Sequence, residues 1–366
     1  MSRLDELIAE LCPNGVPFRK LSDVSMVQRG KRVVREQLPP SGKYLVFQNS
    51  LTPLGFINDY NFHGNTTYII GAGAAGEIGF SRDDFWAADD CYPIICGGEL
   101  DDRFVYHFIL SKKSYIASRV RKGSIPRLSR QVIEDIVIPV PPLPVQQEIV
   151  RILDSFTELT AELTAELTAR KKQYEYYRNE ILSFGDNTAK LTLSKVADVF
   201  RGEYITKSAS VTGNIPVILG GQEPAYYIDK SNHTGEIVVI ARSGASAGFV
   251  SYWNEPIFIT DGFGFEAKED ITTPKYLYYV LKRKEQELNK MKRGAGVPHV
   301  SGEMLGNIEI PIPEKDQQRC IVQILDNFNK LCDDLSDGLP AEIAARQKQY
   351  EYYRDKLLTF QELKVE

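Results

Sequence analysis

The sequence predicts an α+β protein in which two similar globular domains are separated by two long antiparallel helices that form a coiled coil, with an internal pseudo-two-fold repeat. Two observations support this fold class. The seven residues 172–178, Lys-Gln-Tyr-Glu-Tyr-Tyr-Arg, recur unchanged at 348–354. Each copy lies near the end of a long helical pattern that follows a segment with short β-like runs. An exact recurrence over this distance is typical of a duplicated structural unit.

The flanks of the repeated heptapeptide also match. The offset between the copies is 172 residues at upstream positions and 176 at Tyr174, so one length change of four residues lies in the helical part. The matching segments are Arg29-Gly30 with Arg201-Gly202, 123–129 with 296–301, 138–141 with 310–313, and 152–154 with 324–326. We therefore expect four segments: an N-terminal domain at 1–144, a central helical spacer at 145–185, a second domain at 186–316 and a C-terminal helical spacer at 317–366.

The elements follow in order from the local patterns. Residues 1–11 predict a short amphipathic helix whose acidic residues are unlike a signal peptide. Apolar runs rich in β-branched and aromatic residues predict strands, and longer periodic stretches predict helices. In the first domain we expect strands at 44–47, 67–70, 92–95 and 135–138, with a helix at 104–118. In the second we expect strands at 216–219, 236–240, 256–259 and 306–310, with a helix at 274–290.

The two spacers predict helices at about 145–184 and 317–360, because apolar residues recur there every three or four positions. Such helices could be ordinary core helices or two antiparallel struts. Their length favours struts, since an uninterrupted helix of this size spans roughly 55 to 60 Å. Gly338 and Pro340 should break the second helix. The stripe that we assign to the spacer and to partner contacts includes Leu159, Leu163, Leu167, Tyr174, Tyr177, Tyr350 and Tyr353.

A tetrapeptide repeat, Thr-Ala-Glu-Leu, occupies residues 160–167 of the first spacer. Its composition simply favours a helix. Four residues nevertheless do not fit a seven-residue coiled-coil period, so each copy adds a stutter and about 6 Å of length. We expect this segment to be an adjustable part of the spacer.

The charge pattern points to nucleic acid although the chain is acidic overall, with a net charge of −5. Seven basic residues and no acidic residue lie between Lys112 and Arg130, and a basic cluster recurs between Lys282 and Arg293. A solvated helix face is the ordinary explanation, but recurrence before equivalent loops favours phosphate contacts. Which side chains contact phosphates and which read bases stays open. The candidate DNA-binding residues are Lys31, Arg32, Arg119, Arg121, Lys122, Ser124, Arg127, Arg130, Arg242, Ser243, Lys290, Lys292, Arg293 and His299.

No catalytic constellation stands out. Residues 71–76 match a GxGxxG pattern, but a strand is predicted directly after them, so we expect a glycine-rich turn between strands. Asp261, Glu266 and Lys268 superficially resemble a nuclease triad without an equivalent in the first copy. Only Cys91 and Cys96 lie close together among five cysteines, which does not fit a zinc site. We expect a cytoplasmic protein with no metal and no membrane segment.

The combination of motifs resembles the specificity subunit of Type I restriction-modification enzymes. The resemblance rests on the Ile-Pro-x-Pro strand ends, on 146–154, on the Thr-Ala-Glu-Leu copies, on the two heptapeptides and on 338–343, and it covers nearly the whole chain. It implies two target recognition domains that read the two parts of a bipartite, asymmetric sequence in double-stranded DNA. It also implies that the helices dock two methyltransferase subunits, which bind S-adenosylmethionine, and that restriction subunits join the full complex. This chain would then be non-catalytic and would bind no cofactor.

Two other functions remain open from the sequence. A non-catalytic scaffold that binds only proteins would keep the helices but would not need the basic loops. The specificity module of a solitary or fused modification system would carry the same features as a restriction-modification subunit. Sequence-preferring DNA binding separates the first alternative from the others.

Overall fold

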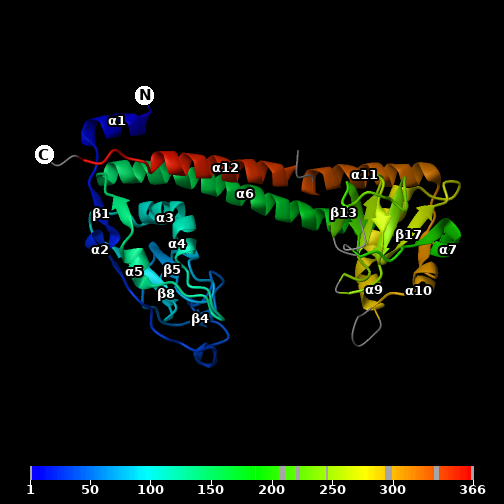
Figure 1. The fold of residues 1–366 in the computed structure, drawn as a ribbon, viewed down its shortest axis with the longest axis horizontal. Coiled ribbons are helices and arrows are strands. Elements are labelled where there is room, and N and C mark those ends of the chain that lie inside the picture. The colour runs from blue at the N-terminus through cyan, green and yellow to red at the C-terminus, as the bar shows by residue number, and fades with distance from the viewer. Residues whose placement is uncertain are drawn as a thin grey trace. The chain divides into compact units, whose positions relative to one another are not determined.

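The computed structural model describes residues 2–185, 187–206, 211–219, 223–244, 246–292, 299–333 and 338–363. The chain forms two compact units (Figure 1). Unit 1 comprises Met1–Thr164 together with Glu342–Glu366, and unit 2 comprises Ala165–Ala341. Each unit therefore combines one globular domain with helical segments from both copies of the repeat.

The globular domain of unit 1 contains a four-stranded sheet in the order β2-β8-β5-β6 and a three-stranded sheet in the order β4-β3-β7. Strand β5 pairs antiparallel with both β6 and β8, and all five of its residues are buried. Helix α3 packs on β5 and β6. The strands are β1 (Phe18–Lys20), β2 (Ser25–Val27), β3 (Tyr44–Phe47), β4 (Gly55–Ile57), β5 (Thr66–Ile70), β6 (Ile78–Ser81), β7 (Phe85–Ala87), β8 (Cys91–Cys96) and β9 (Val137–Pro139). The helices are α1 (Arg3–Leu11), α2 (Leu21–Val24), η1 (Arg35–Gln37), α3 (Asp102–Ser111), α4 (Lys113–Ser118) and α5 (Arg130–Glu134).

Unit 2 repeats this topology with sheets in the orders β11-β17-β14-β15 and β13-β12-β16. Its central strand β14 is also buried throughout and pairs with β15 and β17. The strands are β10 (Lys190–Thr192), β11 (Ala197–Arg201), β12 (Ile215–Ile218), β13 (Tyr226–Ile228), β14 (Ile237–Ala241), β15 (Val250–Trp253), β16 (Phe258–Ile259), β17 (Gly262–Ala267) and β18 (Glu309–Pro311). The helices are α7 (Leu193–Val196), α8 (Pro274–Arg283), α9 (Glu285–Lys290) and α10 (Gly302–Gly306).

The sequence repeat is also a repeat of strand register. In unit 1, β1 pairs antiparallel with β9 and places Phe18 opposite Pro139. In unit 2, β10 pairs antiparallel with β18 and places Lys190 opposite Pro311. Both residues of the second pair follow those of the first by 172 positions. The predicted α+β fold with two similar domains is confirmed.

The long helix α6 (Leu143–Ile181) contributes its first part to unit 1 and its last part to unit 2. In unit 1 it packs against α12 (Leu339–Leu357), where Val145, Ile149 and Leu153 share a buried cluster with Tyr350. The Phe156 ring stacks on the Tyr353 ring with centroids 5.3 Å apart and planes inclined by 18°.

The helix pair of unit 2 repeats this contact with the two copies exchanged, so that the tyrosines come from the first copy and the phenylalanine from the second. Here α11 (Lys315–Asp333) supplies Phe328, which lies 172 positions after Phe156. Its ring centroid is 5.9 Å from that of Tyr177 and 6.3 Å from that of Tyr174. Tyr174 and Tyr177 of the first heptapeptide and Tyr353 of the second thus pack on a phenylalanine from the other copy of the repeat, which explains why these tyrosines belong to the apolar stripe.

Hydrogen bonds at the helix ends show that each pair is antiparallel. The carbonyl of Gln361, just after α12, accepts a hydrogen bond from the amide of Val16 (2.9 Å). The next residue, Pro17, accepts at its carbonyl from the amide of Val140, just before α6 (2.9 Å). The end of α12 therefore lies near the start of α6. In unit 2 the amide of Ile312, before α11, donates to Ala189, after α6 (2.8 Å).

A buried glutamine fixes each helix to its domain. Gln146 at the start of α6 donates from Nε2 to the carbonyls of Glu99 (2.7 Å) and Pro141 (2.6 Å), while its Oε1 accepts from the amide of Asp101 (2.8 Å). Gln318 at the start of α11 repeats the arrangement with Ile271, Pro313 and Thr273. These shared partners are backbone groups, and in unit 2 the Thr272 hydroxyl also donates to Oε1 of Gln318 (3.0 Å).

Four predicted elements differ from the structure. The helix expected at 104–118 is interrupted at Lys112, whose amide bonds to the carbonyl of Ile109 in a tight turn between α3 and α4. The helix expected at 274–290 is interrupted in the same way at Lys284. The strand expected from Asp135 begins only at Val137, because the amide of Asp135 closes α5 on Gln131. The strand expected at 306–310 begins only at Glu309, because Gly306 is the last residue of α10 and the amide of Asn307 bonds to the carbonyl of Glu303. In the part of the chain that the structure describes, no helix is long and apolar enough to cross a membrane.

The remaining expectations on the helices agree with the structure. The break expected at Gly338 agrees with the structure, since Gly338 lies outside any helix and α12 starts at Leu339, while 334–337 lie outside the described residues. Residues 71–76 form a turn between β5 and β6 with no following helix, so the glycine-rich turn is also confirmed.

Candidate DNA interface

The glycine-rich turn after β5 holds a neighbouring hairpin in unit 1. Gly73 and Gly76 have φ values of 82° and 90°, a region that glycine adopts without strain. The amide of Gly73 donates to the carbonyl of Pro126 (3.1 Å), and the amide of Leu128 donates to the carbonyl of Gly71 (2.8 Å). These bonds fix the position of residues 119–127, which we call the basic hairpin.

The basic hairpin brings five of the predicted residues together. Arg121 and Arg127 face each other in an antiparallel bridge, with amide-to-carbonyl distances of 2.8 and 3.2 Å. Leu128, directly after it, is buried and anchors the hairpin in the core. The exposed polar residues on it are Arg119, Arg121, Lys122, Ser124 and Arg127. The hairpin therefore presents cations on a backbone held by hydrogen bonds at its base.

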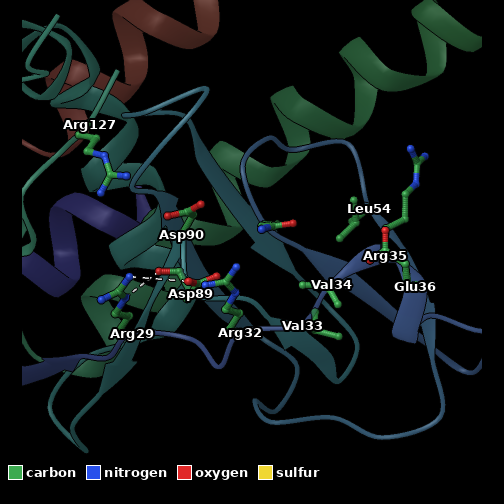
Figure 2. A pocket seen from close by; sticks show the side chains of 11 residues that line it. Arg29, Arg32, Val33, Val34, Arg35, Glu36, Leu54, Asp89, Asp90 and Arg127 are labelled. Atoms are coloured by element: carbon green, nitrogen blue, oxygen red, sulfur yellow. Dashed lines mark hydrogen bonds and ion pairs between the residues drawn. The ribbon is translucent and has the colours of Figure 1, made fainter. Parts of the chain in front are cut away.

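A hollow of about 420 Å³ lies beside this hairpin, and we call it the arginine pocket (Figure 2). It contains side chains of both charge signs, from segments far apart in the sequence. Its lining residues are Arg29, Arg32, Val33, Val34, Arg35, Glu36, Gln48, Leu54, Asp89, Asp90 and Arg127. The structure thus places the predicted residues Arg32 and Arg127 at one site.

The Arg29-Gly30 pair has a structural role in this pocket. A side chain at Gly30 would place its Cβ 2.3 Å from the Ala87 carbonyl oxygen and 2.2 Å from that of Ala88, so only glycine fits. Beside it, the Nε of Arg29 donates to the carbonyl oxygen of Asp89 (2.8 Å), and its Nη2 lies 3.8 Å from Oδ2 of the same residue. A Cβ at Gly202 in unit 2 would likewise lie 2.5 Å from a carbonyl oxygen, that of Thr260. This close backbone approach accounts for the recurrence of the glycine.

Unit 2 has a different set of side chains on the corresponding turn. The amide of Val300 donates to the carbonyl of Arg242 (2.9 Å), as Leu128 does to Gly71, so Arg242 occupies the place of a glycine in unit 1. The Nη1 of Arg242 lies 3.6 Å from Oδ1 of Asp261, and the hydroxyl of Ser243 donates to Oδ2 of that carboxylate. Ser243 also forms a β-bridge with His299. Arg242, Ser243 and His299, all predicted, therefore lie together.

The other predicted residues are dispersed. The Nζ of Lys31 lies 5.8 Å from the centroid of the Trp86 ring, and the Nε of Arg130 pairs with Glu134 at 3.0 Å. Lys290 is exposed at the end of α9, and Lys292 is half-buried two residues later. Arg293 lies outside the described residues. DNA contact stays a prediction for all these residues.

Basic runs in the sequence do not mark the whole arginine pocket. Arg29, Arg35, Gln48, Asp89 and Asp90 line it but lie outside the cationic stretches. Two signals could have identified some of them. Arg29 belongs to a repeated dipeptide, and two consecutive aspartates directly before a buried strand place carboxylates at a sheet edge.

The residues that resemble a nuclease triad are engaged elsewhere. Asp261 is bound by Ser243 and Arg242, while the Nζ of Lys268 lies 3.3 Å from Oδ1 of Asp198. Asp261 and Lys268 are therefore engaged at two different sites. Among the described residues, no group of three or more His, Cys, Asp or Glu side chains could hold a metal ion.

Comparison with known proteins gives consistent matches over the whole chain. The family described as Type I restriction modification DNA specificity domain matches twice, over residues 13–170 and 186–345. A putative type I restriction enzyme specificity subunit of Haemophilus influenzae is 30% identical, covering 94% of this chain and 96% of that protein. The specificity subunit of the Escherichia coli type I restriction enzyme EcoR124I/EcoR124II is 32% identical over 70% of both chains. The crystal structure of the S subunit of a Type I restriction-modification system from M. genitalium matches with a TM-score of 0.68 at 19% identity, covering 94% of this chain and 96% of that one.

Proposed function

The chain belongs to the family of Type I restriction-modification specificity subunits, and from this premise we propose that its two domains read the two parts of a bipartite, asymmetric DNA sequence. The observation that carries this proposal is the pair of equivalent turns. One scaffold presents Gly71 with the basic hairpin in unit 1, and Arg242 with Ser243 in unit 2. Two turns with the same backbone arrangement but different side chains suit the recognition of two different half-sites.

The chemistry of both turns suits DNA. Arginine, lysine and serine donate hydrogen bonds to phosphate oxygens, which fix register, and arginine also reads base edges. The net negative charge of the chain then limits its affinity for DNA on its own. Basic surface from partner subunits would complete the electrostatic attraction.

The helical segments are proposed to dock two methyltransferase subunits. Tyr176 and Tyr352 occupy the same position in the two heptapeptides, and their exposed fractions are 62% and 64%. The flanking tyrosines contact aromatic rings within each unit, so folding explains their repetition, but it does not explain why Tyr176 and Tyr352 are identical. Two copies of one partner, each binding an equivalent helix surface, would explain it, since exposed aromatic side chains are typical anchors of protein interfaces.

The catalytic steps are assigned to the partners. In the proposed assembly the methyltransferase subunits bind S-adenosylmethionine and methylate adenine, and restriction subunits join them for cleavage. This chain supplies DNA recognition and spacing and contributes no catalytic group, metal or cofactor.

Two measurements on co-expressed proteins test the assembly. Native mass spectrometry should give two methyltransferase copies per chain, and selection from random double-stranded DNA by this complex should enrich two short motifs at a fixed separation. A stable complex that enriches no motif would contradict the recognition role. One methyltransferase per chain would contradict paired docking.

A further inference from the structure

The arginine pocket of unit 1 contains polar groups without partners. Among the described residues, no hydrogen bond or ion pair engages the side chain of Arg32, Arg127, Asp90 or Gln48, although all four line the pocket. Arg29, by contrast, already binds Asp89. The pocket thus offers both free donors and free acceptors to a ligand.

We propose that this pocket reads a G·C base pair in the half-site of unit 1, with Arg127 donating to guanine and Asp90 accepting from the cytosine amino group. The proposal rests on the proposed function and specifies the ligand chemistry of one site within it. Figure 2 shows Arg127 and Asp90 at the pocket, on segments that come from the hairpin and from the turn between β7 and β8.

The carboxylates argue against a site for phosphate alone. A phosphate group in this pocket would meet the negative charge of Asp90, which forms no ion pair within the described residues. Arg29 already compensates Asp89. A base edge does not carry this penalty, because it presents acceptors and a donor side by side.

The choice of base pair follows from the donor and acceptor pattern of the major groove. Guanine presents its O6 and N7 acceptors, which match the two parallel N–H groups of one arginine, and cytosine presents its N4 amino group, which matches a carboxylate. An A·T pair would offer the amino group to Asp90 but no equal bidentate acceptor to Arg127. The combination of arginine with aspartate therefore favours G·C.

Methylation mapping of variants tests the assignment. Cells would express the methyltransferase with the wild-type chain, with Arg127→Ala or with Asp90→Asn. Lys20→Ala serves as a charge-matched control, because Lys20 lies on β1 and pairs with Asp135 at 3.0 Å. We expect one G·C position in one half of the motif to relax in both pocket variants, with discrimination reduced roughly fivefold or more. The other half of the motif should stay unchanged, which also shows that the variants fold and assemble.

Three results would overturn the inference. Uniformly weaker methylation without a change of motif would make Arg127 a phosphate contact, and relaxation at an A·T position would contradict the base assignment. An unchanged motif in both variants would remove the pocket from recognition. The wild-type map separates this inference from its premise, since a wild-type chain that directs no split motif contradicts the proposed function itself.

Discussion

The Nδ1 atom of His107 lies 2.9 Å from the hydroxyl oxygen of Tyr350, a residue 243 positions later in the chain. The Nε2 atom of the same buried ring lies 2.8 Å from Oδ1 of Asp154 on α6. One imidazole thus joins the globular domain of unit 1 to both of its helices. In unit 2, Tyr279 occupies the equivalent place and donates its hydroxyl to Asp326 (2.5 Å).

The stability of unit 1 should fall on acidification because of His107. Burial lowers the pKa of His107 below its usual value, despite the opposing effect of its hydrogen bond to Asp154. The unfolded chain therefore binds more protons than the folded chain once the pH falls below about 6.5, and stability is lost from there down to the folded pKa. Urea denaturation at about pH 7.5 and pH 5.5, followed by hydrogen exchange of unit 1 peptides, measures this loss.

His107→Gln should flatten this pH dependence. Its amide can still donate to Asp154 and accept from Tyr350, but it does not titrate. Tyr279→Phe changes the equivalent position of unit 2 and should leave the slope of stability against pH as in the wild type over this range. Parallel pH curves for the wild type and His107→Gln would show that another group titrates.

Gln146→Ala should destabilise unit 1 by roughly 2 to 4 kcal/mol, because it leaves the buried backbone groups of Glu99, Pro141 and Asp101 without their partner. Gln147→Ala, the exposed neighbour, is the matched control and should change the unfolding free energy by less than about 0.5 kcal/mol. Equal effects of the two substitutions would show that the hydrogen bonds of Gln146 do not stabilise unit 1. Thermal and urea denaturation provide the comparison.

Tyr352→Ala should affect partner binding, whereas Tyr353→Ala should affect folding stability. Loss of the Tyr353 ring removes its stack on Phe156 and should cost roughly 1 to 3 kcal/mol of folding stability. Loss of exposed Tyr352 should leave stability nearly unchanged but weaken methyltransferase binding by about 2 kcal/mol, or roughly thirtyfold. Calorimetric titration with the isolated partner measures the second effect. Wild-type affinity in Tyr352→Ala would remove this position from the docking surface.

Arg121→Ala should lower the salt dependence of DNA binding. If Arg121 binds one phosphate, its removal should reduce the slope of log Kd against log salt by about 1, with little change in sequence preference. Lys20→Ala removes the same charge outside the basic hairpin and is expected to retain the wild-type slope. A change of sequence preference in Arg121→Ala would instead identify a base-reading role.

Removal of Thr164–Leu167 should alter the spacing but not the sequence of the two half-sites. The deletion shortens α6 by about 6 Å, comparable to one or two base-pair steps. The methylated motif should therefore keep both parts while the gap between them becomes shorter. Altered half-sites would contradict a role of this segment in spacing alone.

Most of the fold could be predicted from the repeat, because the repeated residues are those that the backbone requires. Gln146 and Gln318 bond to main-chain groups, and Gly30 and Gly202 meet carbonyl oxygens, so both copies require the same residues. The sequence therefore predicted the fold class with its two similar domains and the long helices. The contacts between a tyrosine of one copy and a phenylalanine of the other could not be predicted from the sequence. The packing of Phe156 on Tyr353 depends on how the helices of the two copies pair in the folded chain.

The candidate interface was less predictable for a physical reason. Basic runs identified the hairpin around Arg121 and Arg127, where local sequence carries the signal. The arginine pocket instead joins Asp90 to Arg32 through the strand order, which adjacent residues do not encode. Arg242 could be placed only by the hydrogen bond from Val300, which shows that it replaces Gly71.

Genome-wide mapping of methylated adenines, with the wild-type chain and its methyltransferase expressed together, tests the central claim most directly. The account predicts one asymmetric motif of two short specific parts at a fixed separation. An assembled complex that methylates no motif, or a single uninterrupted one, would contradict the assignment of the two domains to two half-sites.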